Sequence, residues 1–413
     1  MAGSKRSIPG RFALATAALA VLLAGCTAAS SAPSPPHARA TVSPAPPSEP
    51  SVSALPSETP RTHRWDTAVP SVSSARFLSR DFGYATIYYE NRKGGPAPRG
   101  SRLVVSTDLG RSWTDVSPPL SPDMAISDVF FLDPGQAWLT AYDCAGGNGG
   151  LYRTSDGGQS WQRLGSLSAG CSAGTGIFIS FADPSNGWLT SLAPSGGGPG
   201  SLMRTLDGGL TWQPEHDLPT NGVPRFEGLA SGWLAASFPF WGPVFRTTDA
   251  GQSWHRVAPV AVAGGAIPRA SASTPMFFGA IGVLPLTLSQ GGHEVIRFLT
   301  TADAGSTWEP AAAYRAPWPA TNGATGQTPR AGCVGMASPT VWWVCGGDPV
   351  RVAVTTDSGA TWNVRRTAVT GRYPTIVPIG EHRAWLEVSR GGGQLWLTLS
   401  GGRDWRRLTP GRR

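Results

Sequence analysis

The chain has 413 residues, with 34 Lys and Arg against 26 Asp and Glu, and a formal net charge of +8. Its arginines are spread along the sequence rather than clustered in runs, which argues against a nucleic-acid platform. The five cysteines include no CxxC pair and no Cys/His pattern with metal-ligand spacing, so we expect no zinc site. We likewise expect no cofactor.

Residues 1–25 have the pattern of an export signal, with three basic residues near the start and an uncharged run over 12–24. The run ends in the letters LAGC, which resemble the lipobox of bacterial lipoproteins. The resemblance implies that Cys26 becomes the N-terminus and carries a lipid. Such an anchor would hold the protein at the extracytoplasmic face of the bacterial cell membrane. The alternative is an ordinary signal peptide with a chance cysteine. No later segment is apolar for long enough to span a bilayer.

The next segment, residues 26–64, is rich in Pro, Ala, Ser and Thr and has few large apolar side chains. It cannot bury enough surface to offset the entropy of ordering, so we predict a disordered tether. The tether would separate a folded domain, residues 65–413, from the membrane.

The folded domain contains seven copies of an eight-residue pattern, [ST]-x-D-x-G-x-[ST]-W, at intervals of 42 to 54 residues. This interval matches one four-stranded blade of a β-propeller. The aspartates of the first six copies are Asp108, Asp156, Asp207, Asp249, Asp303 and Asp357. In the seventh copy Ser400 takes the place of the aspartate. The pattern resembles the Asp-box, or BNR, repeat.

We interpret each copy as a tight turn between the third and fourth strands of a blade. The carboxylate is suited to accept hydrogen bonds from nearby backbone N–H groups, and the glycine supplies a positive φ. Before each copy, two apolar strand patterns flank a polar turn, as in Asp128–Tyr142. Together these patterns predict an all-β fold, a seven-bladed β-propeller of four-stranded antiparallel blades. The last blade contains four strands of its own, so the sequence shows no obvious strand exchange between the ends; the alternative is an edge strand from the segment around Trp65 against the final blade. Most of the 17 tryptophans fall at repeat positions, which predicts packing between blades.

In such blades the A–B and C–D turns lie on one rim, and the B–C and D–A connections lie on the other. The Asp-box turns are therefore expected to be structural, and binding is expected on the opposite rim, where a rigid scaffold positions loops. Candidate binding residues there are Trp241, His293 in a loop over 288–294, and Tyr314 and Trp318 in a loop over 311–331. Solvated loops without a ligand are the alternative.

A row of arginines is a further candidate. Arg153, Arg204 and Arg246 each precede the aspartate of their repeat by three residues, in three consecutive blades. They are either structural residues that pack through their stems or an anion-binding stripe.

Four cysteines follow Cys26, and an even number in an exported protein suggests two disulfides. The repeat places Cys144 and Cys171 on the same rim, and Cys333 and Cys345 on either side of one A–B hairpin. Among three possible pairings we therefore favour Cys144–Cys171 and Cys333–Cys345.

The repeat specifies a fold rather than an activity. It resembles sialidases, xyloglucanase-type glycoside hydrolases, sortilin-type receptors and the Ycf48 or HCF136 photosystem II assembly factors. A sialidase requires an arginine triad, a Tyr–Glu nucleophile pair and an acidic Asp on the central face, and the sequence does not reveal this set. Size and blade count favour the Ycf48-like resemblance. We predict a membrane-tethered extracytoplasmic propeller that binds a protein or glycan partner as a scaffold or assembly factor; the alternative is an exo-sialidase or other glycoside hydrolase.

Overall fold

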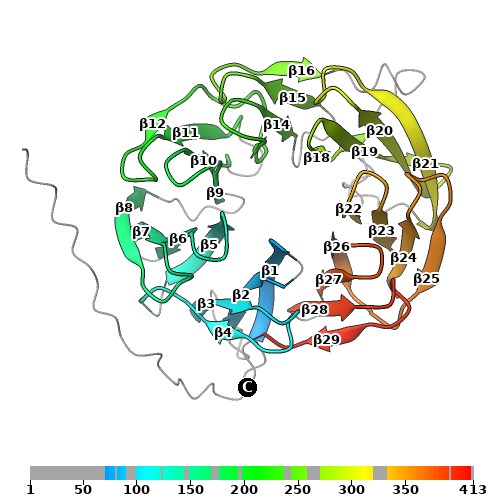
Figure 1. Cartoon of the computed structure of the whole chain (residues 1–413), viewed down its shortest axis with the longest axis horizontal. Helices are drawn as coiled ribbons and strands as arrows, with labels where there is room; N and C mark the ends of the chain where they lie inside the picture. The colour runs from blue at the N-terminus through cyan, green and yellow to red at the C-terminus, as the bar shows by residue number, and fades with distance from the viewer. Residues whose placement is uncertain are drawn as a thin grey trace, which may run out of the picture. The chain divides into compact units, whose positions relative to one another are not determined.

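Seven antiparallel sheets follow one another around a common axis (Figure 1). The ranges that the computed structural model describes are 70–79, 81–89, 99–121, 124–143, 148–168, 176–193, 198–236, 243–257, 270–319, 333–389 and 392–410. The architecture confirms the predicted seven-bladed propeller of four-stranded blades. Within these ranges no helix is long and apolar enough to cross a membrane.

In each blade the first strand lies nearest the axis and the last lies at the periphery. Blade 1 consists of β1 (Pro70–Phe77), β2 (Gly83–Tyr89), β3 (Arg99–Ser106) and β4 (Thr114–Asp115), and blade 2 of β5 (Met124–Phe131), β6 (Ala137–Asp143), β7 (Asn148–Thr154) and β8 (Gln162–Ser168). Blade 3 consists of β9 (Ile177–Phe181), β10 (Gly187–Ser191), β11 (Ser201–Thr205) and β12 (Gln213–Pro214), and blade 4 of β13 (Arg225–Phe226), β14 (Gly232–Ala235), β15 (Val244–Thr247) and β16 (His255–Val257).

The remaining blades continue the same order round the ring. Blade 5 consists of β17 (Ser271–Ala272), β18 (Met276–Phe278), β19 (Ile281–Gln290), β20 (His293–Thr301) and β21 (Glu309–Pro319). Blade 6 consists of β22 (Cys333–Met336), β23 (Trp342–Gly346), β24 (Arg351–Thr355) and β25 (Asn363–Arg366). Blade 7 consists of β26 (Arg372–Pro378), β27 (Ala384–Ser389), β28 (Gly393–Thr398) and β29 (Arg406–Leu408).

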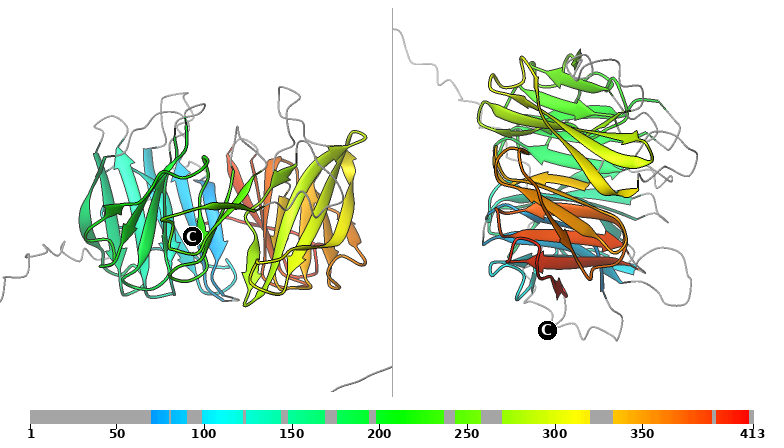
Figure 2. Two further views of the ribbon diagram at one scale, coloured as in Figure 1. Left: turned by 90° about the horizontal axis from the view of Figure 1, so that it is seen from above. Right: turned by 90° about the vertical axis from the view of Figure 1, so that its right-hand side faces the viewer.

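The two rims of the propeller carry different connections between strands (Figure 2). Because successive strands are antiparallel, the A–B and C–D turns share one rim and the B–C and D–A connections share the other. We call the first the turn rim, which includes the repeat turn of blade 1 after β3. We call the second the loop rim, which includes the β19–β20 connection at Gly291 and Gly292.

The repeat turns contain the hydrogen bonds expected of their aspartates. Asp108 Oδ1 accepts from the backbone N–H groups of Arg111 and Ser112, each at 2.9 Å, and Oδ2 accepts from the Ser112 hydroxyl at 2.7 Å. Gly110 within this turn has a φ of 76°, which favours glycine. In the seventh copy the Ser400 hydroxyl accepts from the Asp404 N–H at 2.9 Å. The seventh turn therefore retains one of these hydrogen bonds although it lacks the aspartate carboxylate.

Tryptophans of the second strand join neighbouring blades. Trp138 in β6 stacks on Phe181 of blade 3 with ring centroids 3.7 Å apart, and its indole N–H donates to the Gly208 carbonyl at 2.9 Å. Trp188 stacks on Phe226 of blade 4, also at 3.7 Å. Since Gly208 belongs to a repeat turn, the tryptophan positions the next turn as well as the next sheet. Such aromatic pairs contribute roughly 0.5–1.5 kcal/mol beyond their buried area.

The ring closes by side-chain packing between blades 7 and 1. Among the described strands, β1–β4 and β26–β29 form two separate sheets, which agrees with the prediction of no strand exchange. Val72 of β1 and Leu395 of β28 share one buried apolar cluster, and Trp385 contacts the ring of Phe77. Closure therefore depends on the same kind of contact that joins the other blades.

Blade 5 departs from the regular pattern. Two short strands, β17 and β18, take the place of one inner strand, and both pair with β19. Pro275 lies between them and Pro285 lies opposite in β19; neither has an N–H to donate, so the ladder is interrupted. With 10, 9 and 11 residues, β19, β20 and β21 are the longest described strands. Their hairpin stands above the neighbouring ribbons at the loop rim (Figure 2).

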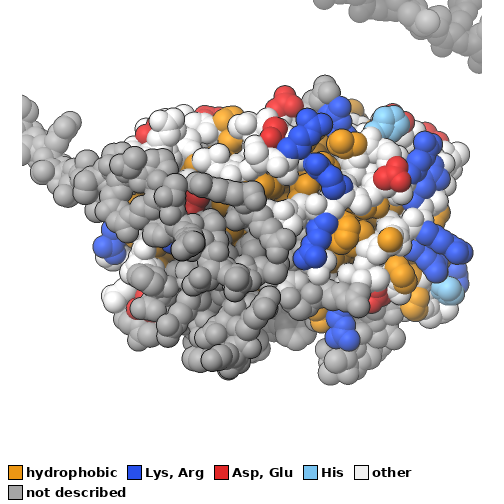
Figure 3. Space-filling model, turned by 90° about the horizontal axis from the view of Figure 1, so that it is seen from below, with side chains coloured by type: hydrophobic (Ala, Val, Ile, Leu, Met, Phe, Trp, Pro, Cys, Tyr) orange, Lys and Arg blue, Asp and Glu red, His pale blue; other side chains and the backbone are white. Residues whose placement is uncertain are grey.

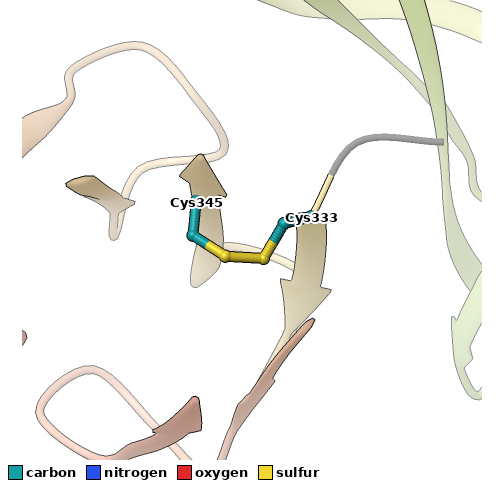
Figure 4. Close-up of a disulfide and its surroundings, with 2 residues drawn as sticks. All are labelled: Cys333 and Cys345. Atoms are coloured by element: carbon teal, nitrogen blue, oxygen red, sulfur yellow. A yellow bond between two sulfur atoms is a disulfide. The ribbon is translucent and has the colours of Figure 1, made fainter. Parts of the chain in front are cut away.

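One disulfide joins the first two strands of blade 6. Cys333 in β22 and Cys345 in β23 are direct register partners with Cα atoms 5.0 Å apart, which confirms the predicted pairing (Figure 4). Cys144 and Cys171 lie outside the described residues, as do Cys26, the export signal and the tether. Those assignments stay predictions.

Candidate functional site

The predicted arginine row lies against tryptophan rings near the turn rim. Arg153 is the register partner of Trp138, and its guanidinium carbon lies 5.2 Å from a ring centroid of that tryptophan. Arg204 lies 6.0 Å from the Trp188 ring, and Arg246 lies 5.3 Å from the Trp233 ring. Through these cation–π contacts the three arginines pack against the tryptophans of the second strands.

Two of the predicted loop residues, Tyr314 and Trp318, come together in blade 5, whereas His293 lies on the opposite face of the sheet. The prediction that they lie in loops is wrong: His293 belongs to β20, and Tyr314 and Trp318 belong to β21. Tyr314 and Trp318 are buried while the residues beside them are exposed, the alternation of a half-buried strand. We call Glu294, Tyr314 and Trp318, which share one face of the sheet, the blade 5 cluster. Trp241 lies outside the described residues.

A bulge in β21 shapes the cluster. His293 pairs with Pro319 and Val295 pairs with Arg315, so three residues of β21, 316–318, stand opposite Glu294 alone. Bulges of this kind redirect side chains and are common beside functional sites. Trp318 lies within the bulge and packs against the backbone of Gly346 at the end of β23. The bulge therefore brings blade 5 against blade 6 at the loop rim.

The cluster contains polar atoms that are buried without a hydrogen-bond partner. Glu294 is 4% exposed, Tyr314 6% and Trp318 2%. Among the described residues, Glu294 Oε1, the Tyr314 hydroxyl and Trp318 Nε1 are all unpartnered. Most buried polar atoms in proteins are hydrogen-bonded, so each exception requires an explanation such as a ligand, an ion or a bound water. Three exceptions at one blade end mark this place as a candidate site.

Burial and neighbouring charges shift the titration of the cluster. Burial raises the pKa of Glu294 to about 7; the Trp318 indole N–H favours the ionised form and offsets part of the effect, although it falls outside hydrogen-bond geometry. Burial also raises the pKa of Tyr314 to about 12, where the positive charge of Arg351 opposes the effect and the negative charge of Glu294 adds to it. Near neutral pH, Glu294 can thus either donate or accept a proton, and the Tyr314 hydroxyl is a donor.

Arginines surround the cluster at the loop rim. Arg351 at the start of β24 donates from Nη1 to the Pro317 carbonyl at 2.9 Å, which ties blade 6 to the bulge. Arg315 is exposed on β21, and Arg366 is exposed at the end of β25. Figure 3, which faces blades 1 and 7 at the bottom of Figure 1, shows Lys and Arg side chains on the right-hand half of the molecule.

Two other buried carboxyls lie in other blades. Burial raises the pKa of Asp128 in β5, while the charge of Arg76 and a hydrogen bond from the Ile179 N–H, at 2.9 Å to Oδ2, oppose the rise. Burial raises the pKa of Glu387 in β27 to about 7. The sequence patterns predict no functional role for either residue. Over the described ranges, no group of three or more His, Cys, Asp or Glu side chains could hold a metal ion.

Comparisons with known proteins found similarity among solved structures. No protein-family model matches the sequence, and no curated protein matches it. A solved structure of Ycf48 bound to a D1 peptide is 22% identical, with a TM-score of 0.45, and covers 70% of this chain and 83% of its own. Ycf48 from Cyanidioschyzon merolae is 18% identical, with a TM-score of 0.47, and the match covers 70% of this chain and 86% of that protein. A polysaccharide lyase, PL25 ulvan lyase, is 10% identical, with a TM-score of 0.48, and the match covers 82% of this chain and 96% of that protein. Function has to be judged from this chain's own residues.

Proposed function

We propose that the chain is a binding protein, tethered at the extracytoplasmic face of the membrane by a lipid on Cys26, that holds a protein or glycan partner on its loop rim. Its role would be that of a scaffold or assembly factor. The observation that carries the proposal is the blade 5 cluster, with three buried and unpartnered polar atoms at one end of the longest hairpin. A docked partner supplies the missing hydrogen bonds directly or through water.

The scaffold around the cluster suits recognition. Glu294, Tyr314 and Trp318 lie on strands, and the Arg351 bond to Pro317 braces the bulge. The cross-strand disulfide of blade 6 begins at the same rim. Side chains held by strands keep their geometry better than side chains on loops, so little ordering entropy is lost when a partner binds.

The distribution of buried carboxyls supports binding over glycoside hydrolysis. Hydrolysis of a glycosidic bond ordinarily needs two carboxyl groups about 5–9.5 Å apart. The carboxyls with a raised pKa are Asp128, Glu294 and Glu387, and they lie in blades 2, 5 and 7. Asp128 interacts with Arg76 of blade 1 and the Ile179 N–H of blade 3, whereas Glu294 lies beside Trp318 of its own blade.

One observation favours the alternative, an exo-sialidase or related hydrolase. Tyr314 and Glu294 are neighbours, and arginines lie around them, which is part of the residue set of a sialidase. The pair lies on β20 and β21, however, which are the outer strands of blade 5, whereas sialidase chemistry occurs on the central face. A panel of fluorogenic sialosides and β-glucosides separates the two functions. Product release that Glu294→Gln abolishes would establish the hydrolase and remove the binding proposal.

The binding proposal is tested by recovering partners from solubilised envelope with the full-length chain. We expect wild-type protein to recover a specific partner, and Glu294→Gln combined with Trp318→Phe to recover much less. Arg163→Gln is the matched control, because it alters an exposed residue on β8 of blade 2 and should leave recovery unchanged. Equal recovery by all three proteins would remove the cluster from the proposal.

The tether is tested separately by fractionation. Cys26→Ser should move the protein from the membrane fraction to the soluble fraction. Unchanged membrane association would contradict a lipid on Cys26.

A further inference from the structure

Two arginines face each other at the loop rim of blade 6. Arg351 opens β24 and Arg366 closes β25, and the two are direct register partners. Partners across antiparallel strands have Cβ atoms about 4.5–5.5 Å apart, and like charges at that separation are destabilising. The ion pairs found among the described residues are Arg102–Asp115, Arg225–Glu227 and His382–Glu381. Neither of the facing arginines takes part in these pairs.

The nearest acidic side chain in sequence is engaged elsewhere. Asp348 precedes Arg351 by three residues in the β23–β24 connection, and its Oδ1 accepts from the Gly371 backbone N–H at 3.3 Å. Arg351 itself is half-buried and uses Nη1 on the Pro317 carbonyl. A guanidinium has five N–H donors, so this bond fixes the side chain and leaves donors for another group. Arg366 is exposed and adds a second guanidinium.

A buried donor lies beside this pair. The charge of Arg351 acts on Tyr314, whose hydroxyl is buried and has no hydrogen-bond partner. Two facing guanidinium groups with a hydroxyl beside one of them are an arrangement suited to an oxyanion, which accepts charge-assisted hydrogen bonds from such donors. Protection of an exposed strand edge would explain Arg366 alone, because charged residues are common on such edges. It does not explain the half-buried Arg351 or the unpartnered hydroxyl.

We propose that Arg351, Arg366 and the Tyr314 hydroxyl form a subsite for one anionic group, a carboxylate, phosphate or sulfate, of the bound partner. The inference rests on the proposed function, since the group belongs to the partner that docks on the loop rim. It adds the chemical class of that group. An acidic peptide and an acidic glycan share this chemistry.

Small anions test the subsite directly. The full-length chain in detergent is titrated with acetate, inorganic phosphate and sulfate at constant ionic strength, with chloride as the balancing anion, and binding is followed by the thermal midpoint. We expect saturable binding of at least one anion, and a loss of about tenfold or more in affinity for Arg351→Gln combined with Arg366→Gln. Tyr314→Phe should lose affinity by a smaller factor. The anion that binds best indicates whether carboxylate, phosphate or sulfate is recognised.

The matched control is Arg163→Gln combined with Arg256→Gln, which removes two exposed arginines from outer strands of blades 2 and 4. It should bind anions as the wild type does. Equal affinity in both double variants, or no saturable binding in the wild type, would overturn the subsite.

Partner recovery distinguishes this failure from failure of the proposed function. Recovery that is equal for wild type and Arg351→Gln with Arg366→Gln would overturn the subsite and leave partner binding intact. Arginine-dependent binding of an anion together with no recovered partner would support the subsite and remove the proposed function.

Discussion

Replacing Glu294 with Gln probes the electrostatic cost of the blade 5 cluster. The folded pKa of Glu294 is about 7 against an ordinary 4.5, because the carboxyl is buried. The unfolded chain therefore releases this proton at lower pH than the folded chain. Between pH 4.5 and 7 the folded state binds more protons, so stability falls as pH rises. The difference between the two pKa values corresponds to about 3 kcal/mol, fully expressed above pH 7.

Glutamine keeps the shape of the side chain and carries no charge at any pH. We expect Glu294→Gln to match the wild type near pH 4 and to exceed its stability by up to about 3 kcal/mol at pH 8. For a propeller of roughly 340 residues, that free energy raises the thermal midpoint by about 4 °C. Other titrating groups, including Glu387, contribute equally to both proteins and cancel in the difference.

The assay is thermal unfolding of both proteins from pH 4 to pH 8 at fixed ionic strength. Glu309→Gln serves as control, because Glu309 is exposed at the start of β21 in the same blade. It should follow the wild type at every pH. A midpoint difference for Glu294→Gln that does not change with pH would refute the assignment of a buried, proton-binding carboxyl. A wild type more stable than the variant at pH 8 would show that the ionised carboxylate has a partner.

Three further predictions concern the framework. Burial raises the pKa of Asp249, but hydrogen bonds from the side chain and backbone of Ser253 and the side chain of Thr247 outweigh it and lower the pKa to about 2. Asp249→Asn should thus destabilise by about 1 kcal/mol at pH 7, and the gap in denaturation midpoints should close as pH falls from 4 towards 2; a constant gap would contradict this. Replacing Cys333 and Cys345 with Ser opens a loop closed over a sequence separation of 12 and should cost about 3 kcal/mol, measured by denaturation with reductant as the second arm. If reductant lowers the stability of the double variant as much as that of the wild type, the Cys333–Cys345 disulfide does not account for the stability that reductant removes. Arg153→Gln should lose about 0.5–2 kcal/mol of cation–π stabilisation on Trp138. Stability equal to that of the exposed-site variant Arg163→Gln would show that this contact contributes nothing.

The sequence by itself determined the number and order of the blades. Each repeat turn is local: Asp108, Ser112 and Gly110 are within five residues, so their hydrogen bonds and positive φ follow from the pattern wherever it occurs. The strands on either side are also local, because hairpins pair neighbours in the chain. The Cys333–Cys345 disulfide was predictable for the same reason, since both residues flank one hairpin.

Only the tertiary structure decided the candidate site. Glu294 and Trp318 are separated by a whole hairpin, and the bulge that leaves Glu294 opposite three residues of β21 has no signature in the alternation of apolar residues. Arg351 reaches Pro317 from another blade. The burial of Glu294 and the position of the facing arginines Arg351 and Arg366 depend on side-chain contacts between blades. The periodic sequence pattern does not specify those contacts. The repeat therefore predicts the ring, and contacts across its blades create the site.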